Sequence, residues 1–229
     1  MLKILHIFSK IEDINARYRI NDPKLTPLML ACASNQLDVA EFLLSSFDDI
    51  DINATFGIET STLQTARSYE MRKLMIEMSK QRNLGINVNA KNLVGITPLF
   101  SARDVMKSME ILIANGADVL ARTNEGEDIF TEYWKQSNEK FLEYLNITEE
   151  LTTLQRLELF TENLDFLSEA IPKKGKLEMP YTILQAESRE RIRCEMERLM
   201  LFFLKTFRDQ NIDLRIVEEQ FIKAENANE

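Results

Sequence analysis

The stretch Asn89-Ala-Lys-Asn-Leu-Val-Gly-Ile-Thr-Pro-Leu-Phe-Ser-Ala-Arg, followed shortly by Met109-Glu-Ile-Leu-Ile-Ala-Asn-Gly-Ala-Asp-Val-Leu-Ala121, decides the fold of this chain. Gly95 suits a tight turn because glycine reaches positive φ without a steric penalty. Thr97 can cap a helix by accepting a backbone N–H, and the proline after it suits the first helical turn. Gly116 suits the left-handed residue that ends a second helix. The stretch therefore predicts a turn, a helix, a loop, a second helix and another turn.

The same order of signals occurs twice more before this stretch. Thr26-Pro27-Leu28 begins a predicted inner helix, and Leu37–Leu44 supply the apolar positions of an outer helix. Ser61-Thr62-Leu63 stands at the same place further on, without the proline. The repeated segments end at Ala16, Ala54, Ala90 and Ala121, which are 38, 36 and 31 residues apart. Such a period predicts a solenoid of stacked helix pairs.

Residues 2–145 resemble the ankyrin repeat family. The resemblance rests on Gly95, Thr97-Pro98-Leu99, Ala102, Leu112 and Asn115-Gly116-Ala117-Asp118-Val119. It implies an all-α solenoid with an N-terminal half-repeat cap, about three full repeats and a degenerate last repeat. It also implies that the protein binds other proteins, without chemistry, through its finger turns and the concave face of its inner helices. A finger is the extended turn that precedes an inner helix. We therefore assign residues 1–146 to an ankyrin repeat domain.

Residues 147–229 show no recognised family resemblance and predict a helical region. The spacing of apolar residues favours one helix from about Thr148 to Ile171, a second from about Tyr181 to Arg208, and a third from Leu214 to about Lys223. In the degenerate last repeat, five large apolar side chains need cover: Ile129, Phe130, Trp134, Phe141 and Leu145. We expect the C-terminal region to dock on that repeat and to bury them.

The composition is that of a soluble protein whose main partner is not nucleic acid. Of the 229 residues, 45% are hydrophobic and 28% are charged, and the net charge of −9 opposes phosphate binding. No apolar run reaches the roughly 20 residues of a membrane span, and we expect no signal peptide. The two cysteines, Cys32 and Cys194, form neither a disulfide framework nor a zinc motif, which fits a reducing cytoplasmic location.

The sequence predicts no enzyme active site. His6 is the only histidine, so a Ser–His pair, a Cys–His pair or a multi-histidine metal site would have to use it. No phosphate-binding loop and no hydrolase or kinase motif is present. We therefore expect no catalytic residue, no metal site and no cofactor.

The predicted binding surface lies on the fingers and the groove beside them. Finger tips have few neighbours, so apolar side chains there form an exposed patch, and such patches mark partner sites. Equivalent positions on the inner helices face the groove beside the tips. The candidate partner-binding residues are Tyr18, Arg19, Met29, Phe56, Ile58, Gln64, Leu93, Val94 and Phe100. The alternative is that the fingers fold over and bury these residues against the loop at 79–86.

The sequence thus favours a monomeric, non-catalytic module that binds a partner protein. Two alternatives stay open: an enzyme whose site lies in residues 147–229, and an oligomerisation or structural module that uses the helix near 181–208. The irregular repeats and the unrelated helical tail also resemble ankyrin-bearing effectors that intracellular bacteria deliver into host cells. Residues 217–229 loosely resemble the glutamate-rich signals of type IV secretion substrates, as in Legionella, and a solvated, frayed terminus is the other interpretation. Such an effector would act on a host protein in the host cytoplasm.

Overall fold

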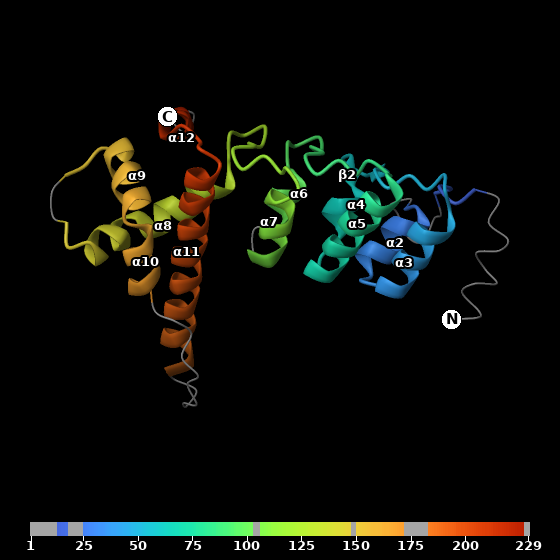
Figure 1. Ribbon diagram of the computed structural model, residues 1–229, viewed down its shortest axis with the longest axis horizontal. Coiled ribbons are helices and arrows are strands. Elements are labelled where there is room, and N and C mark those ends of the chain that lie inside the picture. Colours follow the sequence, from blue (N-terminus) through green and yellow to red (C-terminus); the bar gives the residue numbers. More distant parts are fainter. Residues whose placement is uncertain (1–12, 18–24, 103–105, 148–149, 172–182, 227–229) are drawn as a thin grey trace. The chain divides into compact units, whose positions relative to one another are not determined.

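The structure is a computed structural model, and its helices and strands are shown in Figure 1. It describes residues 13–17, 25–102, 106–147, 150–171 and 183–226. The described elements are helices apart from one hairpin, in which β1 (Thr55–Phe56) pairs with β2 (Thr60–Ser61), so the predicted all-α fold is confirmed. The chain divides into two compact units, residues 1–125 and 126–229. The half-repeat helix predicted before Asp13 lies outside the described residues.

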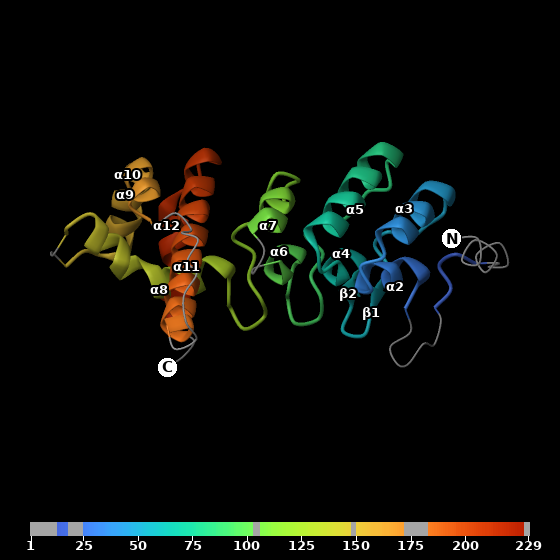
Figure 2. The ribbon, with the colours of Figure 1, turned by 90° about the horizontal axis from the view of Figure 1, so that it is seen from below.

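Three helix pairs build the described part of the first unit. Each pair has an inner helix followed by a longer outer helix: α2 (Pro27–Ala33) and α3 (Leu37–Ser46), α4 (Thr62–Thr65) and α5 (Tyr69–Arg82), α6 (Pro98–Ser101) and α7 (Met106–Ile113). The inner helices line one side of the stack and the outer helices the other (Figure 2). The burial of Leu28, Leu43, Met75, Leu99 and Leu112 places the core between these two layers and between neighbouring pairs.

A hydroxyl cap begins each of the inner helices α2, α4 and α6. The side-chain oxygens of Thr26, Ser61 and Thr97 accept from the backbone N–H three residues further on, at 3.3, 3.4 and 3.2 Å. The predicted cap at Thr97 is therefore confirmed. Gly116, with a φ of 86°, has the left-handed conformation that the sequence predicts for the end of an outer helix.

A repeated asparagine side chain ties each repeat to the next. The amide nitrogens of Asn15, Asn53 and Asn89 donate to backbone carbonyls one repeat further on, those of Asp49, Gly85 and Gly116, at 2.8, 2.9 and 2.8 Å. Their amide oxygens accept from the backbone N–H groups of Asp51, Asn87 and Asp118, each at 2.8 Å. We call Asn15, Asn53 and Asn89 the asparagine clamps. Leu120 stands at the next equivalent position, so the series of clamps ends shortly before the first unit does.

An aromatic core holds the second unit together. Its helices are α8 (Ile129–Tyr144), α9 (Thr153–Glu162), α10 (Leu164–Ala170), α11 (Ile183–Asp209) and α12 (Leu214–Asn226). The ring of Phe130 on α8 lies 4.8 Å from the ring of Phe207 on α11, and the ring of Trp134 lies 5.3 Å from that of Phe221 on α12. Helix α8 was assigned from the sequence to the last repeat, and in the structure its large apolar side chains belong to the core of the second unit.

One helix predicted from the sequence is two helices in the structure. The apolar pattern predicts a single helix from about Thr148 to Ile171, but α9 starts only after its N-cap, Thr152, and ends at Glu162. At Asn163 the backbone leaves the helical region (φ −104°, ψ 24°), and the side-chain amide donates to the carbonyl of Leu159 at 2.8 Å. An asparagine that bonds the local backbone competes with the helical hydrogen bonds. The single-helix prediction is therefore wrong, because the apolar spacing continues through a residue that interrupts the helix.

The last two helices lie close to their predicted bounds. Helix α11 buries one apolar face among its described side chains, which consists of Leu199, Met200, Phe203, Leu204 and Phe207. Helix α12 buries Val217 and Phe221 and continues to Asn226. The described part of the glutamate-rich tail is therefore a packed helix and not a frayed end.

Candidate partner-binding surface

The fingers of the second, third and fourth repeats are joined by hydrogen bonds. The backbone N–H of Leu93, in the third finger, donates to the carbonyl of Ile58 in the second at 2.9 Å. The backbone N–H of Asn124, in the fourth finger, donates to the carbonyl of Val94 at 3.0 Å, and its side-chain amide donates to the carbonyl of Leu93 at 2.8 Å. Because each tip is bonded to the next, the three fingers form one continuous row.

The third finger shows how the sequence builds a rigid tip. Asn92 is buried, and its side-chain oxygen accepts from the N–H groups of Val94 at 3.1 Å and Ile96 at 2.9 Å. Gly95 follows with a φ of 82°, and a Cβ at this position would lie 2.6 Å from the backbone nitrogen of Asn124. Only glycine therefore allows the fourth finger to approach this closely. These contacts fix the backbone of Val94 and leave its side chain at the tip.

Three aliphatic side chains on adjacent tips are exposed to solvent. The exposed fraction is 49% for Ile58, 57% for Leu93 and 44% for Val94. Phe56, on strand β1, is half-buried. We call Ile58, Leu93 and Val94 the finger patch. The structure does not have the alternative arrangement in which the fingers bury these side chains, and an exposed apolar patch on rigid elements is suited to binding a partner.

Two candidate residues on the inner helices are not on the surface. Met29 is fully buried. Gln64 is also buried, and its side-chain oxygen accepts from the N–H of Ser61 at 2.7 Å while its amide nitrogen donates to the carbonyl of Ile96 at 2.6 Å. Gln64 therefore completes the cap of α4 and links it to the third finger, which is a structural role. Of the other candidates, Phe100 is half-buried, and Tyr18 and Arg19 lie outside the described residues.

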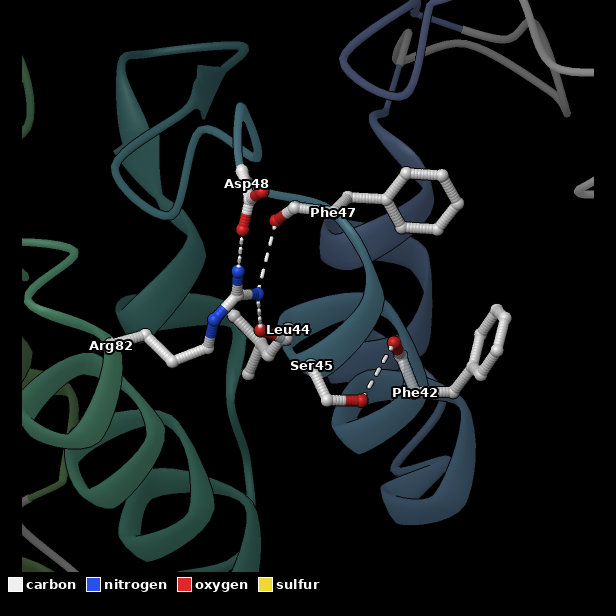
Figure 3. A network of polar contacts seen from close by, with 6 residues as sticks. All are labelled: Phe42, Leu44, Ser45, Phe47, Asp48 and Arg82. Atoms are coloured by element: carbon white, nitrogen blue, oxygen red, sulfur yellow. Dashed lines mark hydrogen bonds and ion pairs between the residues drawn. The ribbon is translucent and has the colours of Figure 1, made fainter.

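A polar network that the sequence analysis did not single out holds the first outer helix to the second (Figure 3). The guanidinium of Arg82, at the end of α5, donates to the carbonyls of Leu44 and Phe47, the latter at 3.1 Å, and bonds the carboxylate of Asp48. Carbonyls at the end of a helix have no partner within it, so Arg82 supplies the hydrogen bonds that end α3. The loop after Ser46 lacks the glycine that is typical of a helix end, and this absence was the sequence signal that another group must bond the last carbonyls of α3.

Two ionisable side chains of the first unit, Cys32 and Arg72, are buried among the described residues. Burial raises the pKa of the Cys32 thiol to about 12, and its Sγ lies 3.5 Å from the sulfur of Met75. Burial lowers the pKa of Arg72 to about 10, and its Nη1 donates to the hydroxyl of Ser108 at 3.0 Å. A thiol with a raised pKa is a poor nucleophile.

Two kinds of feature are absent from the part of the chain that the structure describes. No group of three or more histidine, cysteine, aspartate or glutamate side chains in these residues is arranged to hold a metal ion. No helix in the same residues is long and apolar enough to cross a membrane. The finger patch, which is exposed on turns that hydrogen bonds hold in a row, is the feature on which we base a function.

In the first unit, stacked helix pairs with hydroxyl caps and joined fingers form a solenoid. Residues 24–55, which contain α2 and α3, match the family model for the ankyrin repeat. This match supports the resemblance of the chain to the ankyrin repeat family. An ankyrin repeat suggests a module for protein–protein interaction. No curated protein is similar enough to this chain to count as a match.

Proposed function

We propose that this protein binds a partner protein through the finger patch. The observation that carries the proposal is the exposure of Ile58, Leu93 and Val94 on tips that hydrogen bonds hold in one row. A surface that is already ordered loses little conformational entropy when a partner binds. An exposed apolar patch would otherwise favour aggregation, so a partner that covers it is a physical reason for its presence.

The size of the patch sets the expected binding energy. Full burial of a valine, leucine or isoleucine side chain stabilises a complex by roughly 1.5–3 kcal/mol, and about half of each side chain is already covered, so each contributes about 1 kcal/mol on binding. Two such side chains account for more than the ~1.4 kcal/mol that corresponds to a tenfold change in affinity. Loss of Ile58 and Leu93 together should therefore weaken binding by tenfold or more.

The test compares three full-length proteins. The first is the wild type, the second carries Ile58→Ser with Leu93→Ser, and the third carries Ile216→Ser. Ile216 is the matched control because it is 48% exposed on α12 of the second unit. Proteins captured from cell lysate by each form are quantified by mass spectrometry after cross-linking, and affinities are then measured for the partner identified.

The proposal requires a partner that is lost with the double variant and retained with the control. Because the substituted side chains are exposed, the melting temperature should change little. A partner retained equally by all three proteins would place the binding site elsewhere. A large drop in melting temperature of the double variant would show that Ile58 and Leu93 are core residues.

We further propose that the protein acts as a monomer. The described apolar face of α11 is buried within the second unit, so Leu199 and Phe203 are not free to pair with a second copy. Light scattering of the full chain at several concentrations tests this proposal. A concentration-dependent dimer would favour the oligomerisation module instead.

The proposal that the partner is a host-cell protein rests on the resemblance of residues 217–229 to secretion signals. Deletion of this stretch would remove Phe221 from the core, so a translocation assay should use the full chain with Glu225→Gln and Glu229→Gln. Glu218 is left unchanged because its carboxylate accepts from the N–H of Leu154 at 3.1 Å. Unchanged translocation of this variant would show that the substituted glutamates are not part of a secretion signal.

A further inference from the structure

The backbone at the tip of the second finger is strained at one residue. Glu59 has a φ of 63°, in the left-handed region. The other residues with positive φ among those described are asparagines or glycines, which tolerate this conformation. A glutamate gains no such tolerance, and strained residues of this kind concentrate at binding sites. Glycine at position 59 would relieve the strain, so the structure holds a charged side chain where a small residue would be more stable.

The side chain of Glu59 adds a charge to the finger patch. It is exposed, it directly follows Ile58, and it forms no ion pair among the described residues. Glu125, in the fourth finger, is also exposed and without an ion pair there. In the third finger, the ammonium of Lys91 donates a hydrogen bond to the carbonyl of Arg122 at 3.1 Å. Among the described residues, the carboxylates of Glu59 and Glu125 therefore have no ion pair, whereas the ammonium of Lys91 has a hydrogen bond to a carbonyl.

We infer that the finger patch binds a peptide segment in which aliphatic side chains lie next to a lysine or arginine. The aliphatic side chains would cover Ile58, Leu93 and Val94, and the cation would bond the carboxylate of Glu59. Complementary charge beside an apolar patch orients a partner and selects against acidic ones. This inference rests on the proposed function and names the chemical class of the partner.

The experiment uses the full chain and a phage-displayed library of random dodecapeptides. Selection is carried out on the wild type, on the variant with Leu93→Ser and Val94→Ser, and on Glu59→Lys. The matched control is Glu110→Lys, which reverses an exposed glutamate on the outer helix α7. Peptides enriched on the wild type are synthesised together with twins in which lysine and arginine are replaced by glutamate.

We expect the enriched peptides to carry aliphatic residues beside lysine or arginine. These peptides should bind the wild type and the Glu110→Lys protein equally. Glu59→Lys should weaken them by about fivefold, and it should bind the acidic twins more tightly than the wild type does. Glu59→Gly should raise the melting temperature by about 2–4 °C and still weaken the basic peptides. A stability gain without loss of affinity would show that the carboxylate has no part in binding.

Two failures can be told apart. Enriched peptides that need Leu93 and Val94 but show no excess of lysine or arginine would overturn this inference and leave the proposed function in place. Enrichment that does not depend on the finger patch would overturn both.

Discussion

Replacement of Gly95 by alanine should destabilise the first unit far more than the same change at Gly116. Both glycines have a similar backbone, with φ of 82° and 86°. Alanine in the left-handed region costs roughly 1–2 kcal/mol, and its smaller entropy in the unfolded chain offsets about 0.4–1 kcal/mol of this. At Gly116 nothing lies within 4 Å of the new Cβ, so the loss should stay near 1 kcal/mol on this account.

The atoms around Gly95 add a second contribution to the loss of stability in Gly95→Ala. A Cβ there would lie 2.6 Å from the backbone nitrogen of Asn124, 2.7 Å from its side-chain oxygen and 2.9 Å from the carbonyl carbon of Thr123. Two of these atoms belong to the backbone, so a rotamer change cannot relieve the clash. Overpacking of this kind costs about 1–3 kcal/mol. The total expected for Gly95→Ala is therefore about 2–4 kcal/mol.

The assay is urea denaturation of the two variants and the wild type, followed by far-ultraviolet circular dichroism. Hydrogen exchange adds a local measurement, because the amide of Asn124 donates to the carbonyl of Val94 at 3.0 Å and should exchange faster in Gly95→Ala alone. Equal losses of stability for the two variants would refute the reasoning. They would mean that the third and fourth fingers are not held in close contact.

Three further outcomes follow from the structure. Arg82→Ala should lose about 1–3 kcal/mol in urea denaturation because the carbonyls of Leu44 and Phe47 then lose Nη1, the donor that they share. Asp48→Ala should change stability by less than about 0.5 kcal/mol, since Asp48 is 97% exposed. Cys32 should react with iodoacetamide at pH 8 about 10³-fold more slowly in the folded protein than in urea, as measured by peptide mapping, because burial raises its pKa to about 12. The thiol of the unfolded chain loses its proton at a lower pH than the buried thiol, so the free energy of unfolding should fall as the pH rises above about 9. The fragment 126–229 should fold with its single tryptophan buried, and 147–229, which lacks α8, should show no cooperative transition by circular dichroism.

The parts of the fold that the sequence predicts well depend on short-range geometry. The cap at Thr97 requires only an N–H three residues away, and the turn at Gly95 requires only a glycine. Both signals are complete within a few residues, so no knowledge of packing is needed to interpret them. The finger patch was predictable for a related reason, since Leu93 and Val94 lie at the tip of a turn and tips have few neighbours.

The parts that the sequence does not predict depend on residues far along the chain. Met29 is buried although it occupies the helix position of the half-buried Phe100, so burial there depends on neighbouring elements and not on the position itself. Helix α8 resembles a divergent repeat, yet Phe130 and Trp134 pack on rings from α11 and α12. One signal for this change was present in the sequence: Leu120 replaces the asparagine that would clamp a further repeat.

The two units also differ in charge, and this bears on the partner. The sequence up to Glu125 carries 14 basic and 15 acidic residues, a net charge of −1, whereas the sequence from Gly126 carries 14 basic and 22 acidic residues, a net charge of −8. The whole-chain charge of −9 therefore describes the second unit, and it says little about what the fingers bind. The local charges of Glu59 and Glu125 bear on that question instead. Carboxylates beside the finger patch would raise the rate at which a basic segment associates, while the apolar contacts of the finger patch would set its rate of dissociation.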